Sequence, residues 1–596
     1  MLLKYKNNSL GYFRFFYNVA GKKLLFSIFL SGVVSILDAI GLAMFMPLLQ
    51  SVGGGEQSPK DSMGQLHYIT DVITKLGFPL TLETVLITMV ILFSLKGLAK
   101  FFELNYQVSV MQYFMKKVRY ELVKNLQNIT FKGFTQLEAG TIQNSFIAEV
   151  QKMSQAAKSY LAFIQALFML LIYLIFALMA NYQFAILVVI SAGLTNILYN
   201  RFYKVMKKAS YEISKKGHKF NSHMIQAVHH FKYLKSTNYL TIYSKKLRQL
   251  INQTEHLNKK VAYYNAVTTG IREPMILIIV VAVIYLQLNW MGGSLASIIL
   301  SLLLFYRALN FLMTLQQSWQ GFIQNTGALR SVADITATMT EMKEVQGTKN
   351  FNSLKNEILI SEVDLSYGNK KILNRTNISI PKRQTIALVG ESGAGKTTLA
   401  NIIMGLISPD NGAVVIDGVP LTEYNLDNYR SKIGYISQEP VIFNDNIYNN
   451  ITFWAEHTTE NYRRFWEVIK MASLAEFVDH QSDKELTNLG DNGLLISGGQ
   501  KQRISIAREL FKKVELLILD EATSALDSET ELIIQENIDN LHGQYTMIVI
   551  AHRLATIKNV DRIYLLDKGN VIISGDFQNM VKNSDKFKRM VSLQGL

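Results

Sequence analysis

With 596 residues the chain is too long for one hydrophobic core, so we expect two or more domains. Hydrophobic residues make up 49% of the chain and its mean hydropathy is +0.14, which is more than a soluble enzyme carries and indicates membrane segments. The chain has no cysteine, which excludes a disulfide framework, a thiolate metal site and a cysteine nucleophile.

Six apolar stretches before residue 320 are predicted to cross a membrane, because each approaches the ~20 residues that a helix needs to span the hydrocarbon. Runs such as "MILIIVVAVIYLQLNW" have no polar face, which argues against buried helices of a soluble domain. The stretches are 24–48, 84–102, 160–180, 182–203, 275–290 and 294–315.

Basic residues are concentrated in some of the connections between these stretches. The N-terminal lead and the long connections after the second and fourth stretches are rich in Lys and Arg, whereas "ANYQF" and "MGG" have none. Because Lys and Arg mark cytoplasmic connections, both termini and both long connections are predicted to be cytoplasmic. This placement accounts for much of the net charge of +15, so no nucleic-acid partner is expected.

The polar connections 103–159 and 204–270 contain few glycines and almost no proline, so we expect helices that continue well past the bilayer. The polar, glycine-containing segments near Gly140 and Gly217 are the places where these helices are predicted to turn. At the start of the chain, "LGYFRFFYNVAG" is predicted to be a short amphipathic lead and not a cleavable signal peptide, because the first apolar run is long and lacks a small-residue cleavage site.

A glycine-rich stretch, "VGESGAGKTTL", follows the apolar run "TIALV" and precedes a helical pattern. Its spacing G-x-x-x-x-G-K-T, from Gly390 to Thr397, is that of a loop whose backbone N–H groups surround nucleotide phosphates. Lys396 is expected to reach the β and γ oxygens, and the Thr397 hydroxyl to bind Mg²⁺. The alternative is an ordinary glycine-rich turn before a helix. The order of strand, loop and helix favours the phosphate-binding loop, because an ordinary turn does not require that order.

Two acids and a short glycine motif supply chemistry that a phosphate loop alone lacks. The run "ELLILDEATSALD" places Asp520 at a strand end, where it suits Mg²⁺ coordination, and Glu521 where it can polarise an attacking water. Upstream, "ISGGQKQRISIAREL" begins a helix whose backbone N–H groups can face a γ-phosphate. Downstream, "IVIAHRL" places His552 at another strand end.

Together with Gln438 in "GYISQEP" and Tyr367 in "LSYGN", these motifs resemble the ATP-binding cassette (ABC) family throughout the C-terminal domain. The resemblance implies ATP and Mg²⁺ as cofactors, Glu521, His552 and Gln438 as catalytic residues, and Thr397, Gln438 and Asp520 as metal ligands. It also implies that "TNLGDNG", residues 487–493, is the exporter-specific loop that meets the cytoplasmic helices. The implied ATP-binding residues are Tyr367, Gly390, Ser392, Gly393, Gly395, Lys396, Thr397, Thr398, Ser497, Gly498, Gly499 and Gln500.

The predicted fold is a six-helix all-α transmembrane domain with long cytoplasmic extensions, fused to an α/β phosphate-loop cassette. The predicted boundaries are 1–325 for the transmembrane domain, 326–355 for a linker and 356–596 for the cassette. One set of six spans with one cassette resembles a half-transporter, so a second copy is the expected partner, because each ATP would lie between one copy's phosphate loop and the other's "SGGQ". A homodimer is expected, and a heterodimer with a degenerate partner stays open.

Ionisable residues within the spans are candidates for cargo binding, because charges in the membrane are costly and usually functional. Counting ~1.5 Å per residue places Lys96 and Arg307 both about 20 Å below the outer surface, with Arg272 somewhat deeper. Three cations could hold a phosphate-bearing head group. Alternatively Lys96 and Arg272 snorkel to the cytoplasmic interface and Arg307 pairs with Glu273. For Asp38 the alternative to a functional role is a helix-to-helix hydrogen bond.

Over its whole length the chain resembles the lipid-linked oligosaccharide flippases of bacterial protein glycosylation and related glycolipid exporters. The cues are "SILDAIGLAMFMPLL", "HHFKYLK", "FYRALN" and "EYNLDNYRSKIGYISQEPVIFNDNIYNNITF". The resemblance implies flipping of an anionic lipid-linked glycan, with Lys96, Arg272 and Arg307 on its pyrophosphate, in the bacterial inner membrane. Lys96 stands where arginine is typical, and Asn310 where proline usually follows. The alternative cargo is a peptide or hydrophobic drug, which predicts no dependence on Lys96 or Arg307.

Overall fold

The computed structural model describes residues 9–594 except 46, 49–70, 72, 73, 76–78, 80, 181, 291–294, 521–527 and 552. The chain forms two compact units, one made of Met1–Ile129 and Gly133–Lys343 and the other of Thr130–Lys132 and Glu344–Leu596. The predicted boundaries 1–325, 326–355 and 356–596 stay a prediction. Half of the 326–355 segment is helical, because the last long helix of the first unit continues to Glu341.

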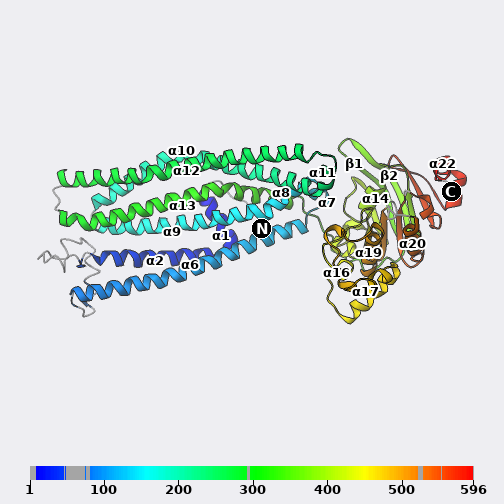
Figure 1. The fold of residues 1–596 in the computed structure, drawn as a ribbon, viewed down its shortest axis with the longest axis horizontal. Coiled ribbons are helices and arrows are strands. Elements are labelled where there is room, and N and C mark those ends of the chain that lie inside the picture. The colour runs from blue at the N-terminus through cyan, green and yellow to red at the C-terminus, as the bar shows by residue number, and fades with distance from the viewer. Residues whose placement is uncertain are drawn as a thin grey trace. The chain divides into compact units, whose positions relative to one another are not determined.

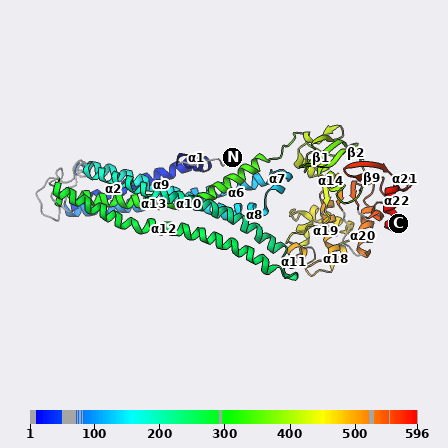
Figure 2. The same cartoon turned by 90° about the horizontal axis from the view of Figure 1, so that it is seen from above.

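The first unit is entirely helical in its described part. Figures 1 and 2 show its long helices running lengthwise beside one another. Its elements are α1 (Ser9–Ala20), α2 (Lys22–Ala43), α6 (Leu82–Gln127), α7 (Phe131–Gln136), α8 (Ala139–Asn144), the π-helix η2 (Ser145–Glu149), α9 (Val150–Ala180), α10 (Tyr182–His229), α11 (Phe231–Ser236), α12 (Leu240–Trp290) and α13 (Leu295–Glu341). Contacts pair α2 with α6 and α9, α9 with α13, and α10 with α12 and α13.

The six predicted spans fall in α2, α6, α9, α10, α12 and α13. In the described part of the chain, three helical stretches are long and apolar enough to cross a membrane: Lys22–Ala43, Leu82–Gln127 and Ala139–Phe176. The last three predicted spans are helical as well, although many of their side chains lie outside the described part. The prediction of a transmembrane helical domain with long helical extensions is confirmed.

The amphipathic lead is helix α1, and one face of it is buried in the first unit's core. Tyr12, Phe15, Phe16 and Val19 follow the i, i+3, i+4, i+7 spacing of a helix face and are all buried. Phe16 stacks on Tyr160 of α9 with ring centroids 4.9 Å apart. The lead is therefore part of the core.

The two predicted turns of the cytoplasmic extensions have different outcomes. The first extension does bend close to Gly140, between α7 and α8. The turn predicted near Gly217 is wrong, because α10 continues through Gly217 to His229 and the chain reverses around α11. Gly217 faces Asn144, whose amide nitrogen would lie 3.6 Å from an added Cβ. This is an ordinary van der Waals contact, so Gly217 marks neither a turn nor an unusually close approach of helices.

The second unit contains two sheets. The antiparallel sheet has the order β2-β1-β4-β5, and the larger sheet has the order β10-β9-β3-β8-β7-β6. The strands are β1 (Glu357–Tyr367), β2 (Lys370–Pro381), β3 (Thr385–Val389), β4 (Asn411–Ile416), β5 (Val419–Pro420), β6 (Ile433–Ile436), β7 (Leu516–Asp520), β8 (Thr546–Ile550), β9 (Arg562–Asp567) and β10 (Asn570–Gly575). In the larger sheet all strands are parallel except β10, which runs antiparallel to β9.

The central strands of the larger sheet are buried on both faces, which their continuous apolar sequences require. Alternate residues enter two separate cores: Leu517 and Leu519 of β7 join one, and Leu516 and Ile518 join the other. Helices cover the sheet: α14 (Lys396–Ile403), α15 (Leu426–Arg430), α16 (Ile447–Thr452), α17 (Thr459–Met471), α18 (Ala475–Asp479), α19 (Gly498–Phe511), α20 (Ser528–Asp539), α21 (Phe577–Asn583) and α22 (Asp585–Leu593). The predicted α/β cassette is confirmed.

Candidate functional sites

The phosphate loop connects buried strand β3 to helix α14. Gly390 has φ +154°, and an added Cβ there would lie 2.3 Å from the Leu566 carbonyl oxygen. Gly395, the N-cap of α14, has φ +102°. Both positions therefore require glycine, for backbone conformation and for close packing.

Lys396 lies inside this loop. Its side chain is buried, and Nζ donates hydrogen bonds to the carbonyl oxygens of Gly390 at 2.8 Å and Glu391 at 3.1 Å. The loop thus surrounds a cation, while the hydroxyl-bearing Thr397 on the first turn of α14 is exposed. A buried ammonium beside a helix N-terminus fits a nucleotide phosphate.

The carboxyl ends of the parallel strands bring further predicted residues to the same edge of the sheet. Leu388 of β3 pairs with Ile550 of β8, and Ile550 pairs with Asp520 of β7. Ile436 of β6 pairs with Leu519, so Gln438 follows at this edge two residues later. The phosphate loop, Asp520 and Gln438 therefore follow neighbouring strand ends, which suits a Mg²⁺–nucleotide.

Asp520 has a partner that the sequence did not indicate. Its carboxylate is buried and accepts a hydrogen bond from the Tyr435 hydroxyl of β6 at 3.2 Å. Burial and the charge of Asp520 raise the pKa of Tyr435 to about 12, so the hydroxyl remains a donor at physiological pH. Tyr435 thereby orients the acid that is expected to serve the metal.

The "SGGQ" motif forms the N-terminus of α19. Ser497 caps the helix, because its hydroxyl accepts from the Gln500 backbone N–H at 3.2 Å and the Gln500 side chain accepts from the Ser497 N–H at 2.9 Å. Ser497 and Gly498 are exposed, and Gly499 is buried. This end of α19 can therefore meet a phosphate from outside the unit.

A buried arginine ties α19 to the segment that follows Gln438. Arg508 donates to the carbonyl oxygens of Asn450 and Val441, both at 2.6 Å, and to the Asn450 side-chain oxygen at 3.0 Å. Burial lowers its pKa, and nearby Glu509 opposes that change. No sequence pattern predicts this link, because Arg508 lies inside a helix with no unusual spacing around it.

For several predicted ATP-site residues, no described contact defines a role. Tyr367 is exposed at the end of β1, opposite Lys370 in the β1–β2 hairpin. Glu521 and His552 lie outside the described residues. Ser392 and Gly393 are exposed in the phosphate loop, and the roles of all these residues stay predictions. Among the described residues, no group of three or more His, Asp or Glu could hold a metal ion by itself.

The membrane unit contains a buried ionic network at Asp38 of α2. Asp38 forms an ion pair with Lys96 of α6 and accepts a hydrogen bond from the Tyr173 hydroxyl of α9 at 3.0 Å. Tyr173 in turn stacks on Phe311 of α13, with ring centroids 5.1 Å apart. Lys96 therefore pairs with an acid inside the bundle. Asp38 also makes the predicted alternative contact, a hydrogen bond between helices, through Tyr173.

The other two predicted cargo residues are less fully defined. Arg307 is exposed and lies one turn from Phe311 on α13, which places it on the same helix face. No ion pair joins Arg307 to Glu273 among the described contacts. Arg272 belongs to α12, and its side chain lies outside the described part of the chain.

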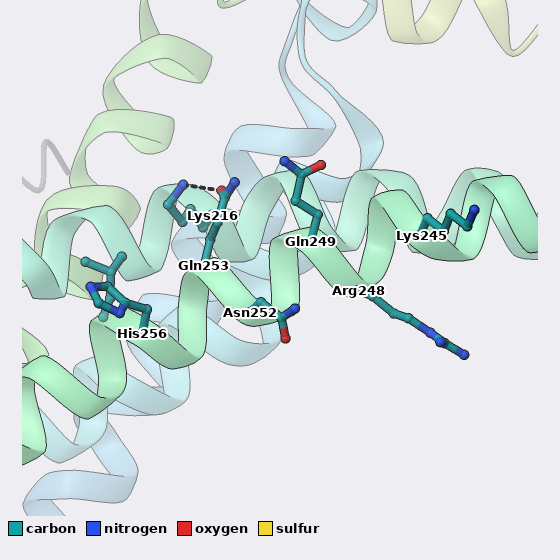
Figure 3. Close-up of a pocket in the computed structure, with 8 residues that line it drawn as sticks. Lys216, Lys245, Arg248, Gln249, Asn252, Gln253 and His256 are labelled. Atoms are coloured by element: carbon teal, nitrogen blue, oxygen red, sulfur yellow. Dashed lines mark hydrogen bonds between the residues drawn. The ribbon is translucent and has the colours of Figure 1, made fainter.

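A basic groove of about 580 Å³ lies between α10 and the N-terminal part of α12. Figure 3 shows its side chains spread along α12, with Lys245 and Arg248 near one end and His256 near the other. Lys216 of α10 donates to the Gln253 side-chain oxygen at 2.7 Å. Because these basic groups are spread along the helix and do not converge, we interpret the groove as part of the solvated basic surface that the predicted cytoplasmic extensions carry.

Comparison with known proteins matches a segment of each unit to a known protein family. Residues 24–315 match the ABC transporter transmembrane region, and residues 373–524 match the ABC transporter family. The ATP-dependent lipid A-core flippase of Desulfotalea psychrophila is 26% identical over 93% of this chain and 96% of its own length. The heterocyst differentiation ATP-binding protein HepA of Nostoc is 27% identical over 80% of this chain and 78% of that protein.

One further relative and one solved structure are similar. The lipid A-core flippase of Francisella tularensis is 40% identical over 41% of this chain and 40% of its own. A solved bacterial Atm1-family ABC exporter with ATP bound superposes with a TM-score of 0.78, over 97% of this chain and 99% of that one, at 19% identity. That likeness concerns the fold, which it supports over nearly the whole chain.

Proposed function

The chain belongs to the ABC transporter family as an exporter half-transporter that couples ATP hydrolysis to transport, and we propose that it flips an anionic lipid-linked glycan across the membrane. The transmembrane region and the cassette lie on one polypeptide. Flipping of lipids or glycolipids agrees with the flippases among its relatives. The lipid-linked oligosaccharide is our specific proposal for the cargo.

The proposal rests on the contacts around Asp38, which link helices that carry basic residues inside the membrane unit. Lys96 of α6 connects through Asp38 and Tyr173 to Phe311, and Arg307 lies one turn from Phe311. Cations at matching depth on two helices suit the pyrophosphate of a lipid-linked glycan, because phosphate oxygens accept several charge-assisted hydrogen bonds. We propose Arg272 of α12 as the third cation of this site.

For the ATP site we propose the roles that the family resemblance implies. The phosphate loop and Lys396 hold the phosphates, Thr397, Asp520 and Gln438 hold Mg²⁺, and Glu521 orients the attacking water with His552 at the γ-phosphate. When bound there, Mg²⁺ would supply positive charge that neutralises the phosphate oxygens. Tyr367 stacks on the adenine. The remaining proposed ATP contacts are Ser392, Gly393, Gly395 and Thr398.

We propose a homodimer in which Ser497, Gly498, Gly499 and Gln500 of each copy complete the ATP site of the other. The exposed, capped N-terminus of α19 supports this arrangement, because it presents backbone donors to a partner. ATP binding closes the cassettes and turns the membrane cavity outward, and hydrolysis resets it. We place the protein in the bacterial inner membrane, with both termini and the cassette in the cytoplasm.

The test is ATPase activity of the purified protein in nanodiscs, titrated with a polyprenyl-pyrophosphate glycan and separately with peptides. We expect stimulation by the glycolipid in the wild type and about a tenfold higher half-stimulating concentration in Arg307→Ala, the loss of one charged contact. Arg330→Ala is the matched control, because Arg330 is an exposed arginine of the same helix, with 57% of its side chain accessible.

Arg330→Ala should behave as the wild type. Stimulation by peptides alone, or equal glycolipid responses of the wild type and Arg307→Ala, would contradict the proposed cargo. The protein would then remain an ATP-driven exporter whose cargo is a peptide or hydrophobic compound.

A further inference from the structure

The ion pair between Asp38 and Lys96 is asymmetric in its exposure. The Asp38 side chain is 4% exposed and that of Lys96 is 30% exposed. The carboxylate is held from the opposite side by the buried Tyr173 hydroxyl. The Lys96 side chain is therefore partly accessible, while the carboxylate is enclosed by α2, α6 and α9.

The charges of this network nearly cancel in the described residues. Asp38 neutralises Lys96, whereas no ion pair among the described residues neutralises Arg307, whose charge acts on Tyr173. A buried carboxylate needs a partner, because an isolated charge in a medium of low dielectric constant is very costly. Asp38 therefore both fixes the position of Lys96 and weakens its attraction for any other anion.

We propose that Asp38 is the resident counter-ion of Lys96 and that a phosphate of the head group displaces it when cargo binds. This inference rests on the proposed function. A phosphate or pyrophosphate carries more negative charge than one carboxylate and offers more acceptor oxygens, so it can compete for the same ammonium. Neutral peptides and neutral drugs cannot, and Asp38 thus selects for multiply charged head groups.

The network also accommodates the displaced acid. When the ammonium turns toward a phosphate, Asp38 keeps the hydrogen bond from Tyr173, which reduces the cost of losing its cation. When the cargo leaves, the ion pair forms again and competes with rebinding. Transport requires binding that is strong enough for entry and weak enough for release, and the counter-ion supplies that balance.

The decisive variant is Asp38→Asn, assayed in nanodiscs with the same polyprenyl-pyrophosphate glycan. The amide has nearly the same shape and its oxygen can still accept from Lys96 or Tyr173, but the competing negative charge is gone. We expect the half-stimulating glycolipid concentration to fall about five- to tenfold and the maximal stimulated rate to fall as well, since release becomes slower. A purely structural role would not lower that concentration.

Glu103→Gln is the matched control. Glu103 is a fully buried acid of α6 that pairs with Lys100 at 2.7 Å and accepts from Ser31 of α2 at 2.6 Å. It therefore joins the same two helices as Asp38 does. We expect this variant to keep the wild-type half-stimulating concentration.

A double variant, Asp38→Asn with Lys96→Gln, tests whether the acid acts through the lysine. We expect the gain in apparent affinity of Asp38→Asn to disappear in the double variant, because no ammonium is left to release. Persistence of the gain in the double variant would overturn the inference.

The outcomes separate the two proposals. A lower half-stimulating concentration in Asp38→Asn alone supports the counter-ion. A second outcome is that the glycolipid stimulates the wild type while Asp38→Asn has the same half-stimulating concentration as the wild type and Glu103→Gln. In that case the counter-ion inference is wrong and the proposed cargo stands. If the glycolipid stimulates neither the wild type nor Asp38→Asn, the proposed cargo fails and the inference falls with it.

Discussion

At the scale of single residues, the hydrogen bond from Tyr435 to Asp520 is the contact that most directly prepares the proposed metal site. The two residues lie on adjacent parallel strands, at the edge where the phosphate loop begins. Asp520 is buried, so the direction of its carboxylate depends on the groups that donate to it.

We predict that Tyr435→Phe raises the Mg²⁺ concentration needed for half-maximal ATPase activity by about tenfold, a typical effect of losing an outer hydrogen bond at a metal site. The measurement is a Mg²⁺ titration of ATPase activity at constant ATP. Tyr564→Phe serves as the control, because Tyr564 of β9 donates to the Ser379 carbonyl at 2.8 Å in the same cassette. A shift of equal size in both variants would show that the effect is only structural.

At the scale of helices, the long helical extensions are joined by a polar cluster around His218 of α10. Its Nδ1 lies 3.0 Å from the Asn144 amide nitrogen, and its Nε2 lies 2.6 Å from the Ser331 hydroxyl of α13. The Asn144 nitrogen can only donate, so Nδ1 accepts and Nε2 carries the proton. The cluster thus requires a neutral imidazole.

Burial lowers the pKa of His218, as does Lys152, while the carboxylates of Glu149 and Glu138 oppose the change. Since the folded-state pKa lies below the usual value of 6.5, the unfolded chain binds more protons below that pH. The stability that neutral His218 contributes is therefore complete above pH 6.5 and is lost as the pH falls toward the folded-state pKa.

We predict that the free energy of unfolding of the wild type falls more steeply than that of His218→Gln between pH 7.5 and pH 5.5, because glutamine does not titrate. The measurement is thermal unfolding of both proteins in detergent at several pH values. If stability changes with pH in the same way in both proteins, His218 is not a neutral residue whose protonation destabilises the fold.

A glycine in a helical region can mark a turn or a close contact between helices. Gly140 and Gly217 both suggested turns, yet an added Cβ on Gly140 would lie 2.2 Å from the Ser222 backbone nitrogen of α10. Gly140 serves the close approach of α8 and α10 and also lies near a real turn, whereas an added Cβ on Gly217 would make only an ordinary 3.6 Å contact with Asn144, inside a continuous helix. A single sequence gives the same signal for a turn and for a close contact, because both need the absence of a side chain.

At the scale of the whole molecule, local patterns predicted the architecture and the phosphate loop. Apolar length indicated the spans, and the order of strand, glycine loop and Lys396 is contained in a dozen residues. The pairs that define the sites are distant in sequence: Asp38 and Lys96 are 58 residues apart, and Tyr435 and Asp520 are 85 apart. No spacing rule links such residues, so their partners emerged only from the fold.

We propose that ATP hydrolysis by the cassette drives the movement of a glycolipid across the membrane. The most direct measurement is the outward transfer of a labelled polyprenyl-pyrophosphate glycan across the membrane of proteoliposomes. Transfer is measured as the fraction of label that is protected from a reagent confined to the outer medium or the lumen. We compare the wild type with Lys396→Ala, which removes the buried cation of the phosphate loop. ATP-dependent transfer by the wild type that Lys396→Ala lacks is the predicted result, and equal transfer by both proteins, or none by the wild type, would contradict the account.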